Sequence, residues 1–268
     1  MENLFLENDL NKELQEHGFV SLPCLNKNSI KSLLNFYQTN TKEALSGFHP
    51  TMFHENLNYK KQVNELILSN LNNFFSLNIN LNYKSLYGNF MVKESGDQSD
   101  MKLHQDWSYV NEDKEKSFAI WIPLIDLNSQ NGALSVIPKS HKLRNNKRGP
   151  GFFCPFENWQ EEIIEKYGLP LYLKAGEAVI WDHKLAHFSP PNLSNEKRIA
   201  ITAIITPKNT PIYHFYKPNH EMIIETYEVN QAFFMSYQIQ NGPNQNYISK
   251  EPYSPFKITK KELECILT

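Results

Sequence analysis

The chain has 268 residues, of which 40% are hydrophobic and 13% aromatic, so it can fill the core of one barrel domain with helices around it. Its formal net charge is −2, and no segment carries a dense stripe of lysine and arginine, which disfavours nucleic acid as a partner. The three cysteines are far apart in the sequence, which fits a reducing compartment. No apolar run is as long as a membrane span, and the acidic N-terminus is unlike a signal peptide. We therefore expect a cytoplasmic protein with no membrane partner.

The first part of the chain is predicted to be mostly helical. Apolar residues recur at helical spacing over residues 8–17, 29–45 and 59–75, whereas residues 19–22 have the composition of a strand. We expect these helices to cover one outer face of a barrel.

The middle of the chain predicts strands. Residues 117–126 form a β-branched and aromatic run that is typical of a buried strand, and the Asn131-Gly132 turn with the apolar run 133–137 indicates a hairpin. The apolar strand predicted over residues 178–181 is followed by a polar turn at Asp182-His183, so we expect His187 to lie at the end of a strand, next to a loop.

Arg198 opens another predicted strand. The alternation that follows places Arg198 and Thr202 on one face and Ile199 and Ile201 on the other. A guanidinium grips a carboxylate with two parallel hydrogen bonds, which a lysine cannot imitate. The commoner fate of an arginine at a strand edge is to face water.

His104 and Asp106 are two residues apart, so on a strand both would point to the same side. Together with His187 they make two imidazoles and one carboxylate, the set that holds non-haem Fe(II) and leaves one face open. With nine His and 29 acidic residues in the chain, about one His-x-acid pair is expected by chance, so the pair alone decides nothing.

The order and spacing of four sequence segments resemble those of the phytanoyl-CoA dioxygenase (PhyH) family of Fe(II)/2-oxoglutarate-dependent oxygenases. The matching segments are residues 103–107, 131–141, 176–182 and 187–192, with Arg198, and the resemblance covers about residues 80–210. It implies a mainly β fold with flanking helices, a double-stranded β-helix of the cupin-like, jelly-roll type. A single domain over residues 1–268 is expected, with a helical buttress over about 1–78, the barrel over about 79–210 and a C-terminal extension over about 211–268.

The resemblance also implies roles for individual residues. His104, Asp106 and His187 would be the iron ligands. Asp106 stands where related halogenases have a small residue, which favours hydroxylation over halogenation. The residues matched to the cosubstrate 2-oxoglutarate are Arg198, which would hold its distal carboxylate, Ser189, Gln105, Trp121 and Lys93. Without the family, Trp121 would be expected in the core, as aromatic residues within strands usually are.

The remaining histidines have simpler interpretations. His183 lies four residues before His187, but the flanking strand and prolines make a metal-binding helix improbable, so a turn or supporting role is expected. His49 and His54 could line a substrate entrance, although an isolated histidine is more often an ordinary residue. His141 is expected in a scaffold turn.

The segments outside the matching blocks offer weaker hypotheses. The basic stretch 142–148 could attract an anionic substrate, but such runs are more often solvated loops, and residues 152–167 could form a lid over the open face. Residues 207–256 are expected to be irregular, with helical character over 225–237, and Thr259 starts a capping box before a final helix. The aromatic residues considered as pocket lining, each equally compatible with the core, are Trp107, Tyr109, Phe153 and Tyr213.

The expected function is hydroxylation of an unactivated carbon of a small-molecule metabolite, with Fe(II), 2-oxoglutarate and molecular oxygen, releasing succinate and carbon dioxide. Amino acids, acyl thioesters and specialised metabolites all remain open as substrates. The alternative is a non-oxidative, cupin-like metal-binding protein, either an isomerase, a hydrolase or a ligand-binding module. No sequence feature indicates the oligomeric state.

Overall fold

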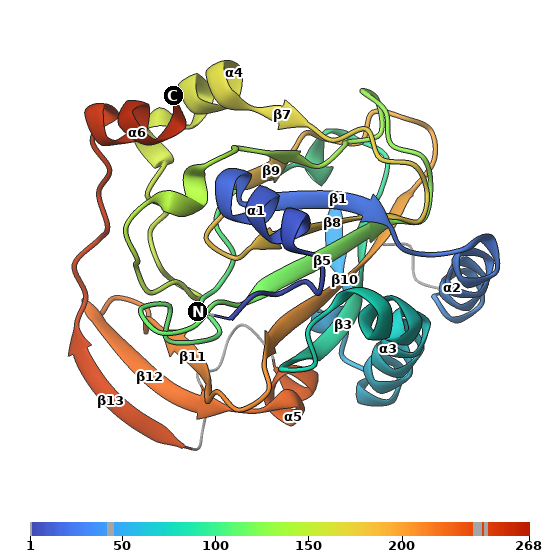
Figure 1. The fold of residues 1–268 in the computed structure, drawn as a ribbon, viewed down its shortest axis with the longest axis horizontal. Helices are drawn as coiled ribbons and strands as arrows, with labels where there is room; N and C mark the ends of the chain where they lie inside the picture. Colours follow the sequence, from blue (N-terminus) through green and yellow to red (C-terminus); the bar gives the residue numbers. More distant parts are fainter. Residues whose placement is uncertain (1, 42–45, 238–242, 244–245) are drawn as a thin grey trace.

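Two antiparallel sheets form the centre of the protein (Figure 1). The computed structural model describes residues 2–41, 46–237, 243 and 246–268. The larger sheet has the order β1-β8-β5-β10-β3-β2, with strands β1 (Phe19–Pro23), β8 (Glu177–Asp182), β5 (Phe118–Pro123), β10 (Arg198–Pro207), β3 (Tyr83–Lys93) and β2 (Phe48–Pro50). The smaller sheet has the order β4-β9-β6-β7, with strands β4 (Met101–His104), β9 (His187–Ser189), β6 (Ser135–Val136) and β7 (Leu169–Pro170).

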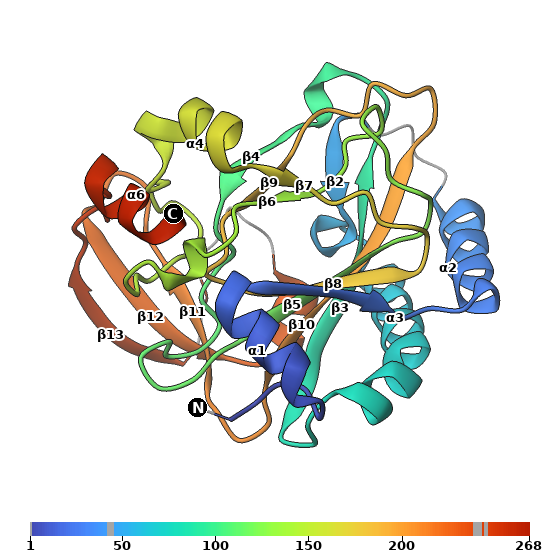
Figure 2. The same ribbon diagram turned by 45° about the horizontal axis from the view of Figure 1, so that its top comes forward.

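The inner faces of the two sheets share one apolar cluster. It joins Val136 of the smaller sheet to Val179 and Ala200 of the larger one. The central strands β5 and β10 of the larger sheet are buried on both faces, which is why they are almost continuously apolar in sequence. The arrangement is the predicted jelly-roll barrel with flanking helices, in which the two sheets face each other (Figure 2).

Three helices cover the outer face of the larger sheet: α1 (Asn8–His17), α2 (Lys27–Asn40) and α3 (Leu57–Asn78). The predicted helices are present, although α2 ends at Asn40 and residues 42–45 of the prediction lie outside the described part. Ile67 of α3 packs so closely on β3 that a Cβ at Gly88 would lie 2.7 Å from its side chain. Helix and sheet therefore need a residue without a side chain at that crossing.

The outer face of the smaller sheet is covered by α4 (Gln160–Tyr167) and the last helix, α6 (Lys260–Leu267). Thr259 and Glu262 form the predicted capping box at the start of α6. The lid prediction for residues 152–167 is wrong, because Ile163 packs with Leu263 on the outside of the barrel. The amphipathic pattern of this segment reflects that contact.

The C-terminal region forms a third sheet where irregular structure was predicted. Strands β11 (Ile212–Tyr216), β12 (Ile223–Val229) and β13 (Tyr247–Pro252) pair antiparallel in that order. Only α5 (Gln231–Ser236) falls in the predicted helix 225–237, whose first residues belong to β12. The strand pattern is weak because this small sheet buries only part of each strand.

The predicted hairpin at Asn131-Gly132 is also wrong. The chain does turn there, with Gly132 at φ +68°, but β6 then joins β9 and β7 in the smaller sheet, whereas β5 stays in the larger one. A turn sequence fixes where the chain reverses and leaves the strand partner open. His187 correspondingly begins the short strand β9, and does not end one.

No helix in the described part of the chain is both long enough and apolar enough to cross a membrane.

Candidate metal and cosubstrate site

Three side chains with metal-binding atoms meet at the edge of the barrel interior. One ligand atom from each of His104, Asp106 and His187 lies within 4.8 Å of the others. His104 ends β4, directly opposite His187 at the start of β9, and Asp106 follows two residues after β4 ends. The pairing of two short strands thus brings together the residues that the sequence analysis grouped as ligands.

The hydrogen bonds of the two imidazoles fix which nitrogen is free. Nδ1 of His104 lies 2.7 Å from the carbonyl oxygen of Lys102, and Nδ1 of His187 lies 3.0 Å from that of Leu185. A carbonyl only accepts, so each Nδ1 must carry the proton. In this tautomer of the neutral imidazole, Nε2 is the nitrogen that has the lone pair for metal coordination.

The carboxylate of Asp106 faces these imidazoles. Its Oδ2 accepts a hydrogen bond of 2.9 Å from the Trp181 indole, and its Oδ1 lies 3.8 Å from Nε2 of His187. Burial alone would raise the pKa of Asp106, but His187, the other nearby imidazoles and the indole bond hold that pKa below its usual value. Burial, with His187 close by, lowers the pKa of His104 to about 4. At neutral pH Asp106 is therefore an anion and His104 a neutral imidazole, the forms in which these two residues bind a divalent metal.

These three residues line a cavity of about 460 Å³ inside the barrel. Its walls are mostly apolar and aromatic, with a few polar groups among them. Of the residues matched to 2-oxoglutarate, the ones that line this cavity are Arg198, Ser189, Gln105 and Trp121.

Arg198 is a buried cation, with 2% of its surface exposed. Its Nη1 donates to the carbonyl of Gly132 at 2.9 Å, its Cζ lies 5.2 Å from the Trp121 ring centroid, and its Nε is buried without a partner among the described residues. Burial lowers the pKa of Arg198 to about 9. In the described part of the chain no carboxylate pairs with it, so an anionic ligand in the cavity would satisfy both its charge and its free donors.

Lys93 does not reach the cavity. It lies beside Arg198 in the β3–β10 pairing, but its Nζ donates to the carbonyls of Ser189, at 3.0 Å, and Pro190. Burial, and then the charge of Arg198, lowers the pKa of Lys93 to about 7. Lys93 is therefore hydrogen-bonded to the main chain at the end of β9.

The other histidines considered from the sequence are not part of this ligand set, although His183 lies near enough to lower the pKa of Asp106. His183 is fully buried, with Nδ1 at 2.7 Å from the Ser117 hydroxyl, and His141 is buried with Nε2 at 3.0 Å from the Gln15 carbonyl. His49 and His54 border a smaller cavity next to α2 and α3, and neither lines the cavity of the candidate ligands.

Among the aromatic residues considered as pocket lining, Trp107 and Tyr109 border the cavity of the candidate ligands. Phe153 and Tyr213 border a different cavity, of about 770 Å³. This second cavity is the larger one, but it contains none of the three candidate ligands, so we place the chemistry in the smaller.

Sequence reasoning missed part of the cavity wall. Met52 and Phe53 close one side of it from a 3₁₀ helix (Thr51–Phe53), and Asn89 of β3 offers an amide whose Oδ1 has no partner in the described residues. Trp181, which the sequence analysis included only as part of the matching segment 176–182, donates to Asp106. The inward alternation of β3 and β8 was the signal available for Asn89 and Trp181.

Comparison with known proteins supports the same interpretation of the fold. The family model for phytanoyl-CoA dioxygenase (PhyH) matches residues 15–200. A phytanoyl-CoA dioxygenase of Arabidopsis thaliana is 31% identical over 133 residues, 47% of each chain, and a phytanoyl-CoA dioxygenase domain-containing protein 1 homolog of Dictyostelium discoideum is 25% identical over 169 residues, 59% of this chain and 56% of its own. The chain thus matches about half the length of these curated relatives.

Solved structures share the fold at low sequence identity. The 2-oxoglutarate-dependent carbocyclase SnoK from nogalamycin biosynthesis has a TM-score of 0.56 at 14% identity, covering 77% of this chain and 86% of its own. HygX from Streptomyces hygroscopicus, crystallised with nickel, 2-oxoglutarate and hygromycin B, has a TM-score of 0.53 at 13% identity, covering 76% and 88%. Because the family model spans well over half of the chain, and the fold agrees with it, this protein belongs to the phytanoyl-CoA dioxygenase (PhyH) family.

Proposed function

We propose that this protein is an Fe(II)/2-oxoglutarate-dependent dioxygenase that hydroxylates an unactivated carbon of a small-molecule metabolite, with release of succinate and carbon dioxide. The observation that carries the proposal is the convergence of two imidazoles, each with Nδ1 at a carbonyl oxygen, and one carboxylate on a cavity that also holds the buried Arg198. Two imidazoles and a carboxylate on one side of a metal leave positions open for a cosubstrate and oxygen.

Each residue has a distinct part in this proposal. His104, Asp106 and His187 would hold Fe(II), and the iron with 2-oxoglutarate would supply the oxidising chemistry. Arg198 would bind the distal carboxylate, with Ser189 on the same wall. The apolar side of the cavity would exclude water and receive the carbon to be oxidised.

The lining of the cavity favours a substrate whose reacting end is uncharged. Once Arg198 is paired with 2-oxoglutarate, the remaining wall next to the candidate ligands is formed largely by apolar and aromatic residues, such as Met52, Phe53, Met91 and Leu134. A charged group placed there would lose its hydration without gaining a partner.

A non-oxidative metal protein is the other candidate, and Arg198 argues against it. A metal hydrolase or isomerase has no need of a buried guanidinium with an unpaired donor on the wall of the metal cavity, whereas a dicarboxylate cosubstrate requires a cation there.

A turnover screen tests the proposal. The protein is incubated with Fe(II), 2-oxoglutarate and air in the presence of pooled metabolites, and succinate is measured for each pool. A true substrate should raise succinate release and gain one oxygen atom by mass spectrometry. The Asp106→Ala variant is the control and should give no substrate-dependent succinate; equal release from both proteins would contradict the proposal.

A further inference from the structure

A buried ion pair holds the segment that follows the candidate ligand Asp106. The Arg148 guanidinium donates to both carboxylate oxygens of Glu112, at 2.8 and 2.6 Å, and its Nε donates to the carbonyl oxygen of Asp106 at 2.7 Å. The two side chains are only 6% and 8% exposed. One planar group thus links the main chain at Asp106 to a side chain six residues farther along.

The same two segments are joined again through Ser108. Its main-chain N–H donates to the Arg148 carbonyl at 3.1 Å, and the Arg148 N–H donates to the Ser108 hydroxyl at 3.2 Å. Between these contacts lie Trp107 and Tyr109, which line the cavity of the candidate ligands. The residues from Asp106 to Tyr109 lie outside any strand, so these contacts take the place of a β-ladder.

We propose that the Arg148–Glu112 pair is a positioning element for the metal site, which fixes the main chain of Asp106 and thereby the place of its carboxylate. Neither residue of the pair lines the cavity of the candidate ligands, so the pair would act through its contact with Asp106. This inference rests on the metal site of the proposed function.

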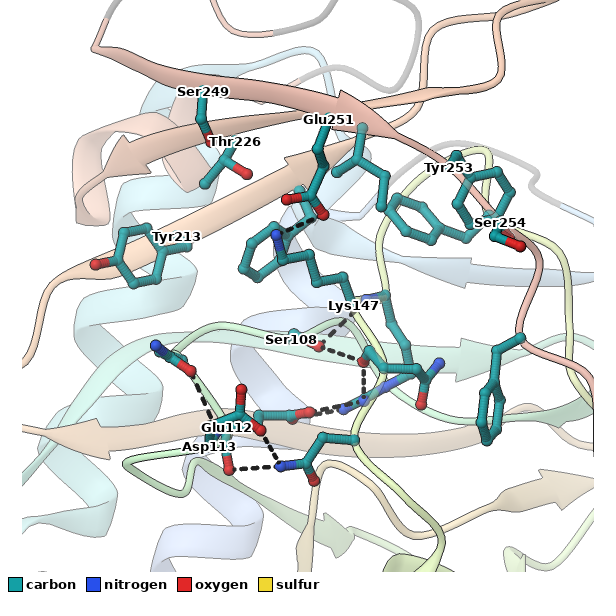
Figure 3. Close-up of a pocket in the computed structure, with 18 of the residues that line it drawn as sticks. Ser108, Glu112, Asp113, Lys147, Tyr213, Thr226, Ser249, Glu251, Tyr253 and Ser254 are labelled. Carbon is teal, nitrogen blue, oxygen red and sulfur yellow. Dashed lines mark hydrogen bonds and ion pairs between the residues drawn. The ribbon is translucent and has the colours of Figure 1, made fainter.

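The pair also faces the second cavity, of about 770 Å³, on the side away from the candidate ligands. Figure 3 shows Ser108 and Glu112 on the wall of this cavity, with Lys147 and Glu251 joined across it. A small ion can therefore reach the place of the Arg148 guanidinium from solvent, and this makes chemical rescue possible.

Binding of Co(II), a visible probe for this ligand set, tests the proposal. In a folded Arg148→Ala protein we expect Co(II) affinity to fall about 10- to 100-fold, as when groups that orient metal ligands are removed, and the visible spectrum to change. Added guanidinium should restore part of the affinity and spectrum, whereas tetramethylammonium at equal ionic strength should not. A role in stability alone predicts wild-type affinity in the folded variant.

Lys147→Ala is the matched control. Lys147 is the neighbouring residue, borders the same cavity and pairs with Glu251 at 2.7 Å, but this pair is about two-fifths exposed and does not contact Asp106. The control should bind Co(II) like the wild type.

Two milder variants keep the test decisive if Arg148→Ala does not fold. Arg148→Lys keeps the charge but loses the planar fork, and Glu112→Gln keeps the shape but loses the charge. Each should weaken Co(II) binding and change its spectrum; folded variants with wild-type affinity and spectrum would overturn the proposal. Failure of the wild type itself to bind Co(II) would be a different result, because it would remove the metal site on which both proposals depend.

Discussion

His104 and His187 are directly opposite each other where β4 pairs with β9, with ring centroids 4.3 Å apart. This one residue pair in the β4–β9 register brings together two residues that are far apart in the chain. Because side chains alternate along strands, a shift of one residue would turn one imidazole away from the other. The candidate metal site is therefore built into the strand pairing of the smaller sheet.

Replacement of Arg198 should weaken binding of 2-oxoglutarate. For Arg198→Ala we expect a loss of roughly 2–4 kcal/mol, the range for truncating one partner of a buried charge pair. Calorimetric titration of 2-oxoglutarate into the anaerobic Fe(II) protein measures this. Arg144→Ala, which removes an arginine from an exposed loop, should leave the affinity unchanged. An unaltered affinity in Arg198→Ala would show that the arginine has another role.

Replacement of Trp181 tests the hydrogen bond to Asp106. Trp181→Phe keeps an aromatic ring but removes the N–H donor that lies 2.9 Å from Oδ2. We expect metal affinity to fall about 10-fold, since the carboxylate loses a group that orients it. The same change at Trp159, outside the smaller sheet, is the control and should have no effect on metal binding. Equal affinities in both variants would count against an orienting role.

The stability of the metal-free protein should fall as the pH is lowered from about 6.5 to about 4. Burial lowers the pKa of His141 and of His214 from the ordinary histidine value of 6.5 to about 4. Between these values the unfolded chain binds protons that the folded chain does not, so unfolding takes up protons and is favoured by acid. Above about 6.5 these two histidines are unprotonated in both states, and below about 4 they are protonated in both, so their contribution to the pH dependence should flatten at each end.

A single substitution checks this pH dependence. His214 packs among aromatic rings, including Trp107 and Tyr237, so phenylalanine is a fitting replacement. His214→Phe should reduce the slope of unfolding free energy by up to about 1.4 kcal/mol per pH unit, as expected for one proton. Urea unfolding at several pH values measures the slope, and an identical slope in the variant would refute the assignment to His214.

The contact between α3 and β3 should show coupled substitutions. Ile67→Ala should destabilise the fold by about 2–5 kcal/mol through the cavity that it leaves. Gly88→Ala should cost about 1–3 kcal/mol because its Cβ would meet Ile67 at 2.7 Å. In the double variant the new methyl occupies the space left by Ile67, so the combined loss, measured by denaturant unfolding, should be smaller than the sum. Strict additivity would show that the two residues do not compete for this space.

The sequence predicted best those features that depend on local periodicity. The helices before the barrel and the alternation from Arg198 are of this kind, because burial of one face leaves a direct pattern in the residues. The grouping of His104, Asp106 and His187 came from residue chemistry and family resemblance, and the structure brings their atoms together.

Features set by distant partners could not be predicted in the same way. The turn at Gly132 was visible, but whether β6 joins β5 or β9 depends on pairing energies between remote segments. The contacts of Arg148 and Trp181 with Asp106 could not be predicted either, since they join segments far apart in the chain. The small C-terminal sheet lacked a strong pattern because its strands are only partly buried.

The most direct test of the central claim is an anaerobic titration of the protein with Fe(II) and 2-oxoglutarate, followed by visible absorption. We predict a metal-to-ligand charge-transfer band that appears only when both are present, because the keto acid would chelate an iron held by His104, Asp106 and His187. The band should require less 2-oxoglutarate in the wild type than in Arg198→Ala. No band at saturating Fe(II) and 2-oxoglutarate would contradict the assignment of this cavity as an iron and 2-oxoglutarate site.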